Sequence, residues 1–203
     1  MTGVDAVVFD LGNVLITVNE ERAMERFAAR TGKTAAEIKT YFYTTPHATE
    51  LSLGKITKRQ FYRIVSHDLG FTGEYDELAL IWSDIFEPIT PMIEMAQSLA
   101  TRRPRLILSN TNVIHADFFL EHYPWINEFD AVILSHEVGL LKPDAAIYRL
   151  AVEKAGLPAD RILFIDDLNA NVQGAHAAGL QAFQYQNPEA TRAELTKRGV
   201  LTI

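Results

Sequence analysis

The sequence predicts an α/β protein in which a three-layer, doubly wound parallel sheet carries an inserted helical subdomain. Short apolar runs without polar alternation recur along the chain, and helical stretches separate them. Unbroken apolar runs are typical of strands buried on both faces, as in a parallel sheet. Strands that alternate with helices form such a sheet, with helices on both of its faces.

Five apolar runs are the predicted strands. They are residues 6–9, 106–108, 131–134, 162–165 and 181–183. Between them, Thr90 and Pro91 supply an N-cap and a first-turn proline. Pro143 opens a further helix that ends near Gly156, and Gly179 closes the helical run 171–178.

One stretch, residues 20–86, contains helix signals and no convincing strand. Thr34 with Glu37 and Thr57 with Gln60 have the spacing of capping boxes. A helical block of this length is too long for a crossover connection. We therefore expect a core made of residues 1–17 and 88–203 and a helical cap made of residues 18–87.

The composition excludes several classes of protein. The 203 residues include no cysteine, so disulfides and thiolate metal sites are impossible, and the chain suits a reducing, cytoplasmic location. No apolar run approaches the roughly 18 residues that span a bilayer, and no secretory signal is visible, so we expect no membrane partner. The net charge of −7 argues against nucleic acid. Whether the chain is a monomer or a homodimer is left open.

Polar residues follow four of the predicted strands. Those that can carry chemistry are Asp10 and Gly12, Ser109 and Asn110, Lys142, and the pair Asp166 and Asp167. Because ligands of open α/β sheets bind beyond the carboxyl ends of the strands, we expect these residues to form one site.

Together these residue types suit phosphoryl transfer. Mg²⁺ prefers hard oxygen ligands, which Asp10, Asp167 and the Gly12 carbonyl can offer, with Asp166 nearby. Lys142 and Ser109, with the backbone near Gly12 and Asn110, would hold the phosphate of a small phosphorylated substrate. Asp10 could then attack phosphorus and form an aspartyl-phosphate, with Lys142 as the other catalytic residue.

Four segments carry a family resemblance. They are residues 9–15 (FDLGNVL), 108–112 (LSNTN), 139–144 (GLLKPD) and 164–167 (FIDD). In this order they resemble the four motifs of the haloacid dehalogenase-like hydrolase superfamily. Their form is similar to the branch that contains α-glucose-1-phosphate phosphatase and the phosphatase domain of soluble epoxide hydrolase. The resemblance implies a Rossmann-like core, a small helical cap after the first motif, Asp10 as nucleophile, phosphate binding by Ser109 and Lys142, and Mg²⁺ held by Asp10 and Asp167.

Gly12 departs from the family pattern. Most phosphatases of the superfamily have a second Asp at this position, where it acts as general acid and base. Glycine cannot transfer a proton, and such transfer is typically worth 10²–10⁴-fold in rate. The resembling glucose-1-phosphate branch also has a Gly-Asn pair here, so the phosphatase interpretation stands.

The cap should select the substrate. Its candidate residues are Tyr41, Phe42, Tyr43, His47, Glu50 and the loop of Gly54 and Lys55. Of the remaining histidines, His115 is the best candidate to line the pocket, since it follows the second motif.

The leading hypothesis is thus an Mg²⁺-dependent phosphatase for a small metabolite such as a sugar phosphate. A 2-haloacid dehalogenase on the same fold is one alternative; it needs a positive group near the nucleophile and no metal, and the first motif contains no Arg. A catalytically impaired binding protein, suggested by Gly12, is the other.

Overall fold

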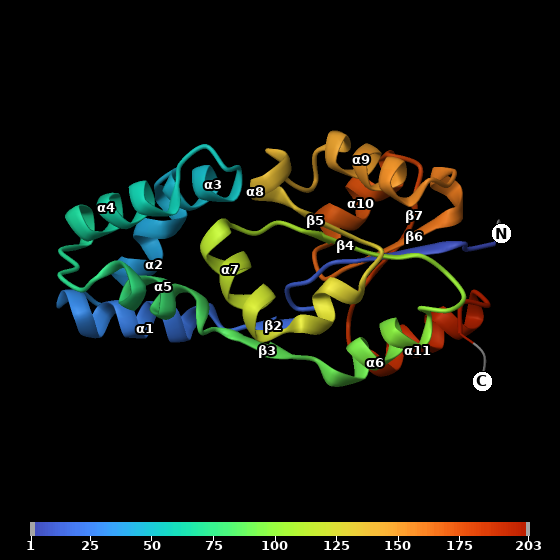
Figure 1. The fold of residues 1–203 in the computed structure, drawn as a ribbon, viewed down its shortest axis with the longest axis horizontal. Coiled ribbons are helices and arrows are strands. Elements are labelled where there is room, and N and C mark those ends of the chain that lie inside the picture. Colours follow the sequence, from blue (N-terminus) through green and yellow to red (C-terminus); the bar gives the residue numbers. More distant parts are fainter. Residues whose placement is uncertain (1–2, 202–203) are drawn as a thin grey trace.

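The computed structural model describes residues 3–201, in which five parallel strands form the central sheet (Figure 1). In chain order they are β1 (Ala6–Phe9), β4 (Arg105–Ser109), β5 (Ala131–Leu134), β6 (Ile162–Asp166) and β7 (Gln181–Gln184). Their spatial order is β5-β4-β1-β6-β7. The predicted parallel sheet is confirmed, and each predicted apolar run lies within a strand.

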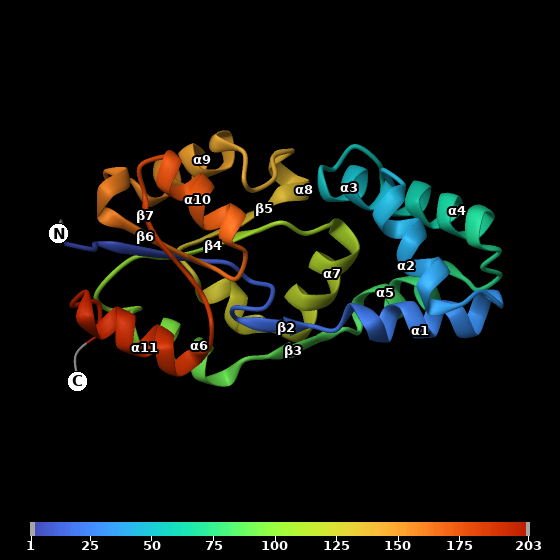
Figure 2. The ribbon, with the colours of Figure 1, turned by 180° about the vertical axis from the view of Figure 1, so that it is seen from behind.

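Alternate residues of β1 pack on opposite faces of the sheet. Ala6 and Val8 join a core cluster with the helices α9 (Ala145–Ala155) and α10 (Asn169–Ala177). Val7 and Phe9 join a second cluster on the other face. Three helices that follow the helical insertion contribute buried residues to this second cluster: α6 (Thr90–Ser98), α7 (Val113–His122) and α11 (Pro188–Lys197). Figures 1 and 2 show the resulting three layers, with α9 and α10 on one side of the sheet and α6 and α11 on the other.

The strand order reverses at β1. From β1 the chain builds outward through β4 to β5, and it then crosses to β6 and β7 on the other side of β1. In sheets of this kind the crevice at the reversal, beyond the carboxyl ends of the strands, receives the ligand. Residues that directly follow β1, β4 and β6 therefore meet at this crevice.

Five helices lie within residues 20–83, in the long connection between the first and second strands of the sheet. They are α1 (Glu20–Thr31), α2 (Ala35–Thr44), α3 (His47–Ser52), α4 (Lys58–Leu69) and α5 (Tyr75–Ser83). Both predicted capping boxes are present, at Thr34 and at Thr57. This helical insertion, called the cap below, lies beyond the carboxyl ends of the strands (Figure 2).

A two-stranded antiparallel ribbon connects the sheet to the cap. It pairs β2 (Ile16–Val18) with β3 (Phe86–Pro88), and the sequence did not predict it. Three residues are too few to show a strand pattern, and β3 contains a proline, which argues against a strand. The division into 1–17, 18–87 and 88–203 stays a prediction, and its residues 1–2 and 202–203 lie outside the described residues.

The remaining elements are short. They are α8 (Ser135–Val138) and the 3₁₀ turns η1 (Pro124–Glu128) and η2 (Ala159–Arg161). Two predicted helix starts were wrong by one or two residues: Thr90 is already helical, and α9 begins after Asp144, whose side chain caps it.

None of the helices in the described part of the chain combines the length and the apolar character that crossing a bilayer requires.

Candidate functional site

One buried lysine joins two carboxylates at the carboxyl edge of the sheet. The Nζ atom of Lys142 lies 2.7 Å from Oδ1 of Asp10 and 2.7 Å from Oδ2 of Asp166. The Lys142 side chain is 1% exposed, Asp166 is fully buried and Asp10 is 10% exposed. Of the three side chains, that of Asp10 is the most exposed, and Asp10 and Lys142 both line the cavity at this edge.

Asp166 is fully engaged in holding its neighbours. Besides Lys142, its oxygens accept hydrogen bonds from the Leu168 backbone N–H at 2.8 Å and from Nδ2 of Asn171 at 2.9 and 3.1 Å. Asn171 is itself buried in the first turn of α10, and the sequence did not identify it. Asp166 therefore orients Lys142 and joins it to α10.

Asp167 points toward the loop after β1. Its Oδ2 accepts a hydrogen bond from Nδ2 of Asn13 at 3.2 Å. The same Asn13 side chain accepts from the Val18 backbone N–H through Oδ1, and its φ of 54° lies in the left-handed region that Asn tolerates. Asn13 stands in the first motif, but no role was assigned to it from the sequence.

The charges of this cluster are coupled. Burial raises the pKa of Asp10, Lys142 opposes this shift, and the nearby Asp166 adds to it. Burial alone would lower the pKa of Lys142, but Asp10 and Asp166 outweigh it and the net shift is upward. Burial also raises the pKa of Asp167. Two buried carboxylates around one ammonium leave a net negative charge, so a further cation would be favourable here.

The predicted phosphate-binding residues lie around Asp10, with one distinction. Ser109 is buried at the end of β4 and lines the same cavity as Asp10 and Lys142. Asn110 instead uses its side chain on the backbone of Lys142: Nδ2 donates to the carbonyl at 2.9 Å, and Oδ1 accepts from the N–H at 2.8 Å. Its side chain thus fixes the loop that carries Lys142.

The three carboxylates also fit a divalent cation. Asp10, Asp166 and Asp167 each offer one oxygen, and these oxygens lie within 4.8 Å of one another. All are hard oxygen donors of the kind that Mg²⁺ prefers, and they carry the excess negative charge described above. The three predicted carboxylate donors are therefore brought together, although Asp166 already accepts hydrogen bonds from three partners. Gly12, the fourth predicted donor, lines the same cavity, and its role stays a prediction.

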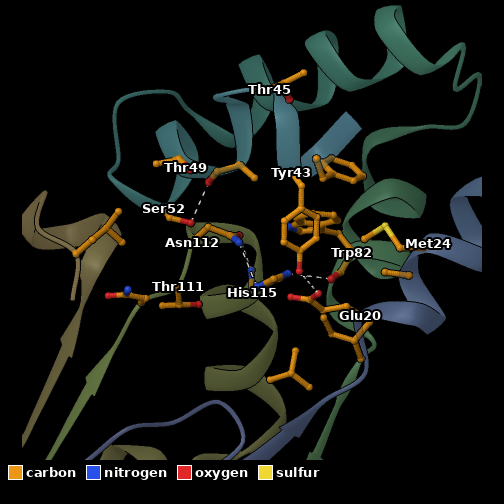
Figure 3. Close-up of a pocket in the computed structure, with 17 residues that line it drawn as sticks. Glu20, Met24, Tyr43, Thr45, Thr49, Ser52, Trp82, Thr111, Asn112 and His115 are labelled. Atoms are coloured by element: carbon orange, nitrogen blue, oxygen red, sulfur yellow. Dashed lines mark hydrogen bonds between the residues drawn. The ribbon is translucent and has the colours of Figure 1, made fainter. Parts of the chain in front are cut away.

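Two adjoining cavities connect this cluster to the cap. The core cavity, of about 540 Å³, contains Asp10, Gly12, Ser109, Lys142 and Asp167. The cap cavity, also about 540 Å³, lies between α1, α2, α3 and α7 (Figure 3). Six residues line both cavities: Val18, Glu20, Tyr43, Asn110, Thr111 and His115. The two cavities therefore form one continuous space above the nucleophile candidate.

The predicted substrate-selecting residues of the cap divide into two groups. Phe42 and Tyr43 line the cap cavity. Tyr41 and His47 instead lie near Asp68, with the Tyr41 hydroxyl donating to its carboxylate at 2.8 Å. Glu50 and Lys55 are absent from both linings, and Gly54 packs so closely on the His136 carbonyl that a side chain there would overlap it.

His115 lines both cavities, as predicted, but its ring is used to join cap and core. The Oδ1 of Asn112 caps α7 by accepting from the backbone N–H groups of Ile114 and His115. Its Nδ2 therefore faces His115 and donates to Nδ1 at 3.1 Å. The Nε2 of His115 then donates to the Trp82 carbonyl at 2.9 Å. Burial lowers the pKa of His115 to about 4. A neutral ring with both nitrogens engaged holds the cap against α7 and is unsuited to proton transfer.

This burial of His115 predicts an acid-sensitive stability. Between pH 6.5 and 4 the unfolded chain binds a proton at His115 that the folded chain does not, so the free energy of unfolding falls as the pH falls. Between pH 7 and pH 4.5, we expect the free energy of unfolding of His115→Gln to fall by about 2 kcal/mol less than that of the wild type. This figure allows for the partial exposure of the His115 ring. Urea unfolding in EDTA at both pH values measures it. Equal pH dependence in the two proteins would show that His115 is protonated in the fold.

Comparison with known proteins agrees with this geometry. Residues 4–179 match the family model described as haloacid dehalogenase-like hydrolase. D-ribitol-5-phosphate phosphatase of Bacteroides thetaiotaomicron is 25% identical over 199 residues, which cover 94% of this chain and 96% of that protein. GMP/IMP nucleotidase YrfG of Escherichia coli strain K12 is 25% identical over 199 residues, covering 94% of this chain and 87% of that protein.

The fold has solved relatives as well. A haloacid dehalogenase family enzyme from Bacteroides thetaiotaomicron, crystallised in complex with magnesium and inorganic phosphate, superposes with a TM-score of 0.84. The match covers 91% of this chain and 96% of that chain at 24% identity. At this identity the likeness shows the fold, and the fold is that of the predicted superfamily.

Proposed function

The chain belongs to the haloacid dehalogenase-like hydrolase family, and from this premise we propose that it is an Mg²⁺-dependent phosphatase for a small phosphorylated metabolite. We further propose that the reaction passes through an aspartyl-phosphate on Asp10. The observation that carries the proposal is the Lys142 ammonium, 2.7 Å from Asp10 and from Asp166, beneath a cavity that also contains Ser109 and Asp167. The named phosphatases among the relatives support it.

In this mechanism the Asp10 carboxylate attacks phosphorus. A new bond forms between its oxygen and phosphorus, the bond to the ester oxygen breaks, and the alcohol leaves with a proton from water. Water then attacks the same phosphorus, which releases inorganic phosphate and restores the carboxylate. Lys142 and Ser109 hold the phosphate oxygens, and Asp166 keeps the ammonium in place.

Asp10, Asp167 and the Gly12 carbonyl would hold Mg²⁺, with Asp166 beside them. When bound, the cation supplies positive charge that screens an anionic substrate from these carboxylates. A protein with a net charge of −7 must attract a phosphate through such local charges, because its overall field repels anions.

The names of two relatives support a small phosphate monoester as the substrate. One is named for a polyol phosphate and another for nucleotides, and we propose a sugar or polyol phosphate for this chain. The cytoplasmic location inferred from the absence of cysteine belongs to the same proposal, and both a monomer and a homodimer are compatible with it.

A phosphate-release screen tests the proposal. Sugar, polyol and nucleotide monophosphates, together with an aryl phosphate, are incubated with Mg²⁺ or with EDTA. We expect turnover only with Mg²⁺. Chloride release from a 2-chloro acid in EDTA, without any phosphate release, would instead support the dehalogenase alternative. Binding of a phosphate ester without turnover would support the impaired binding protein.

Gly12 provides a prediction about rate. We expect Gly12→Asp to leave aryl phosphate hydrolysis intact or raise it, because an Asp can activate the attacking water. It should raise alkyl phosphate hydrolysis at least about tenfold, because a poor leaving group also gains from a general acid. A Cβ at Gly12 would lie 3.2 Å from Cγ2 of Val18, so the substitution is also made in Val18→Ala, which gives it room. Steady-state kcat for both substrates measures the effect. A loss for both substrates in the folded double variant would contradict it.

A further inference from the structure

Glu20 lies where the two cavities meet, and the proposed function does not use it. It is the first residue of α1, separated from the ribbon strand β2 by the N-cap Asn19, and it lines the core cavity and the cap cavity. Figure 3 shows its carboxylate beneath the ring of Tyr43, between the cap helices and α7. A molecule bound at Asp10 that extends into the cap cavity must therefore pass this carboxylate.

A hydrogen bond from the cap fixes the position of Glu20. The Tyr43 hydroxyl donates to its Oε2 at 2.8 Å, and this bond raises the pKa of Tyr43. Among the described residues, no lysine or arginine forms an ion pair with Glu20, because the nearby Arg22 pairs with Asp84 instead. Glu20 is exposed, so solvent screens part of its charge, but no ion pair among the described residues neutralises it where the two cavities meet.

The rest of the cap cavity contains no other charged side chain. Among the described residues that line it, Glu20 is the sole Asp, Glu, Lys or Arg. The other polar lining residues are uncharged: Tyr43, Thr45, Thr49, Ser52, Trp82, Asn110, Thr111, Asn112 and the neutral His115. The single lysine of the core cavity, Lys142, is already shared between Asp10 and Asp166. Such a cavity offers hydrogen bonds to an uncharged molecule and no cation to an anionic one.

A shallow groove beside the cavities adds to this negative potential. Glu20 lines it together with Glu21 and Glu87. All three glutamates are exposed, so solvent weakens their field, but together they repel a second anionic group.

We propose that Glu20, held in place by Tyr43, makes this site select phosphate monoesters whose leaving group is uncharged and reject those that carry a second anionic group. Sugars and polyols belong to the accepted class; phosphorylated carboxylic acids and bisphosphates belong to the rejected one. The inference rests on the proposed phosphatase function and identifies its specificity-determining residue.

The test compares two substrates that differ in one group. 4-(Hydroxymethyl)phenyl phosphate and 4-carboxyphenyl phosphate have nearly the same shape, and their aryl leaving groups need little protonation. With Mg²⁺, we expect the wild type to prefer the hydroxymethyl compound at least about tenfold in kcat/KM, equivalent to about 1.4 kcal/mol. Glu20→Gln should reduce this preference to within about threefold.

A matched control separates this local effect from a general loss of charge. Glu21→Gln makes the same change at the next residue of α1, which lines the shallow groove but neither of the two cavities. It should keep most of the wild-type preference. Tyr43→Phe should lower the preference to an intermediate value, because the carboxylate loses its anchor.

The outcomes are distinguishable. If neither aryl phosphate is hydrolysed with Mg²⁺, the proposed phosphatase function fails. If the wild type hydrolyses both equally well, or if Glu20→Gln keeps the wild-type preference, the specificity role of Glu20 is overturned and the phosphatase function stands. A loss of preference in Glu21→Gln equal to that in Glu20→Gln would also overturn it.

Discussion

Asp10→Asn is expected to lower kcat for p-nitrophenyl phosphate at least about 10³-fold, because the amide cannot act as a nucleophile toward phosphorus. The substitution preserves the shape of the side chain, so Lys142 and Asp166 keep their contact. Burial already disfavours the charged form of Asp10, so the free energy of unfolding should be unchanged or higher. Steady-state kinetics with Mg²⁺ and urea unfolding measure the two effects separately.

Asp5→Asn is the matched control for this variant. Asp5 pairs with Arg161 at 2.6 Å and is 42% exposed. It lies at the amino end of β1, the end opposite Asp10. An exposed pair of this kind contributes little, so activity should stay within about twofold of the wild type. Activity in folded Asp10→Asn equal to that of Asp5→Asn would eliminate Asp10 as the nucleophile.

Lys142→Met should have the second largest effect, on both activity and stability. The ammonium is almost fully buried between Asp10 and Asp166, and its removal leaves two carboxylates without a counter-charge. Breaking a buried ion pair typically costs 3–5 kcal/mol, and we expect about that loss in the free energy of unfolding at pH 7 in EDTA. Loss of the phosphate-holding charge should lower kcat/KM at least about 10³-fold.

A double variant distinguishes the electrostatic cause from a loss of packing. Adding Asp166→Asn to Lys142→Met removes one of the two carboxylates, so about half of the lost stability should return. Activity should stay low, because the lysine is still absent. If the double variant is no more stable than Lys142→Met, the destabilisation has a different origin.

The fold could be predicted because its signals are local. Apolar runs marked all five strands of the sheet, and two threonines with their capping partners marked the starts of α2 and α4. The residues after β1, β4 and β6 could be placed together because parallel strands end at one edge. The ribbon β2–β3 could not be predicted, since three residues contain no measurable period.

Within the site, contacts that depend on side-chain direction were beyond the sequence. The backbone near Asn110 was predicted to hold the phosphate, and this stays a prediction; the contact of its side chain with the backbone of Lys142 could not be predicted. Asn171 holds Asp166 from the first turn of α10, a role that no motif marks. Tyr41 and Tyr43 are two residues apart on one helix, and only the structure separates the one that contacts Asp68 from the one that contacts Glu20.

The central claim, that Asp10 is phosphorylated during turnover, has a direct test. Gly12 cannot activate water, so the aspartyl-phosphate formed from a good leaving group should break down more slowly than it forms. We expect an acid quench of wild-type protein turning over p-nitrophenyl phosphate with Mg²⁺ to trap up to one phosphate per chain on Asp10, identified by peptide mass spectrometry, with a matching burst of p-nitrophenol. Turnover without a burst and without phosphate on Asp10 would contradict the mechanism.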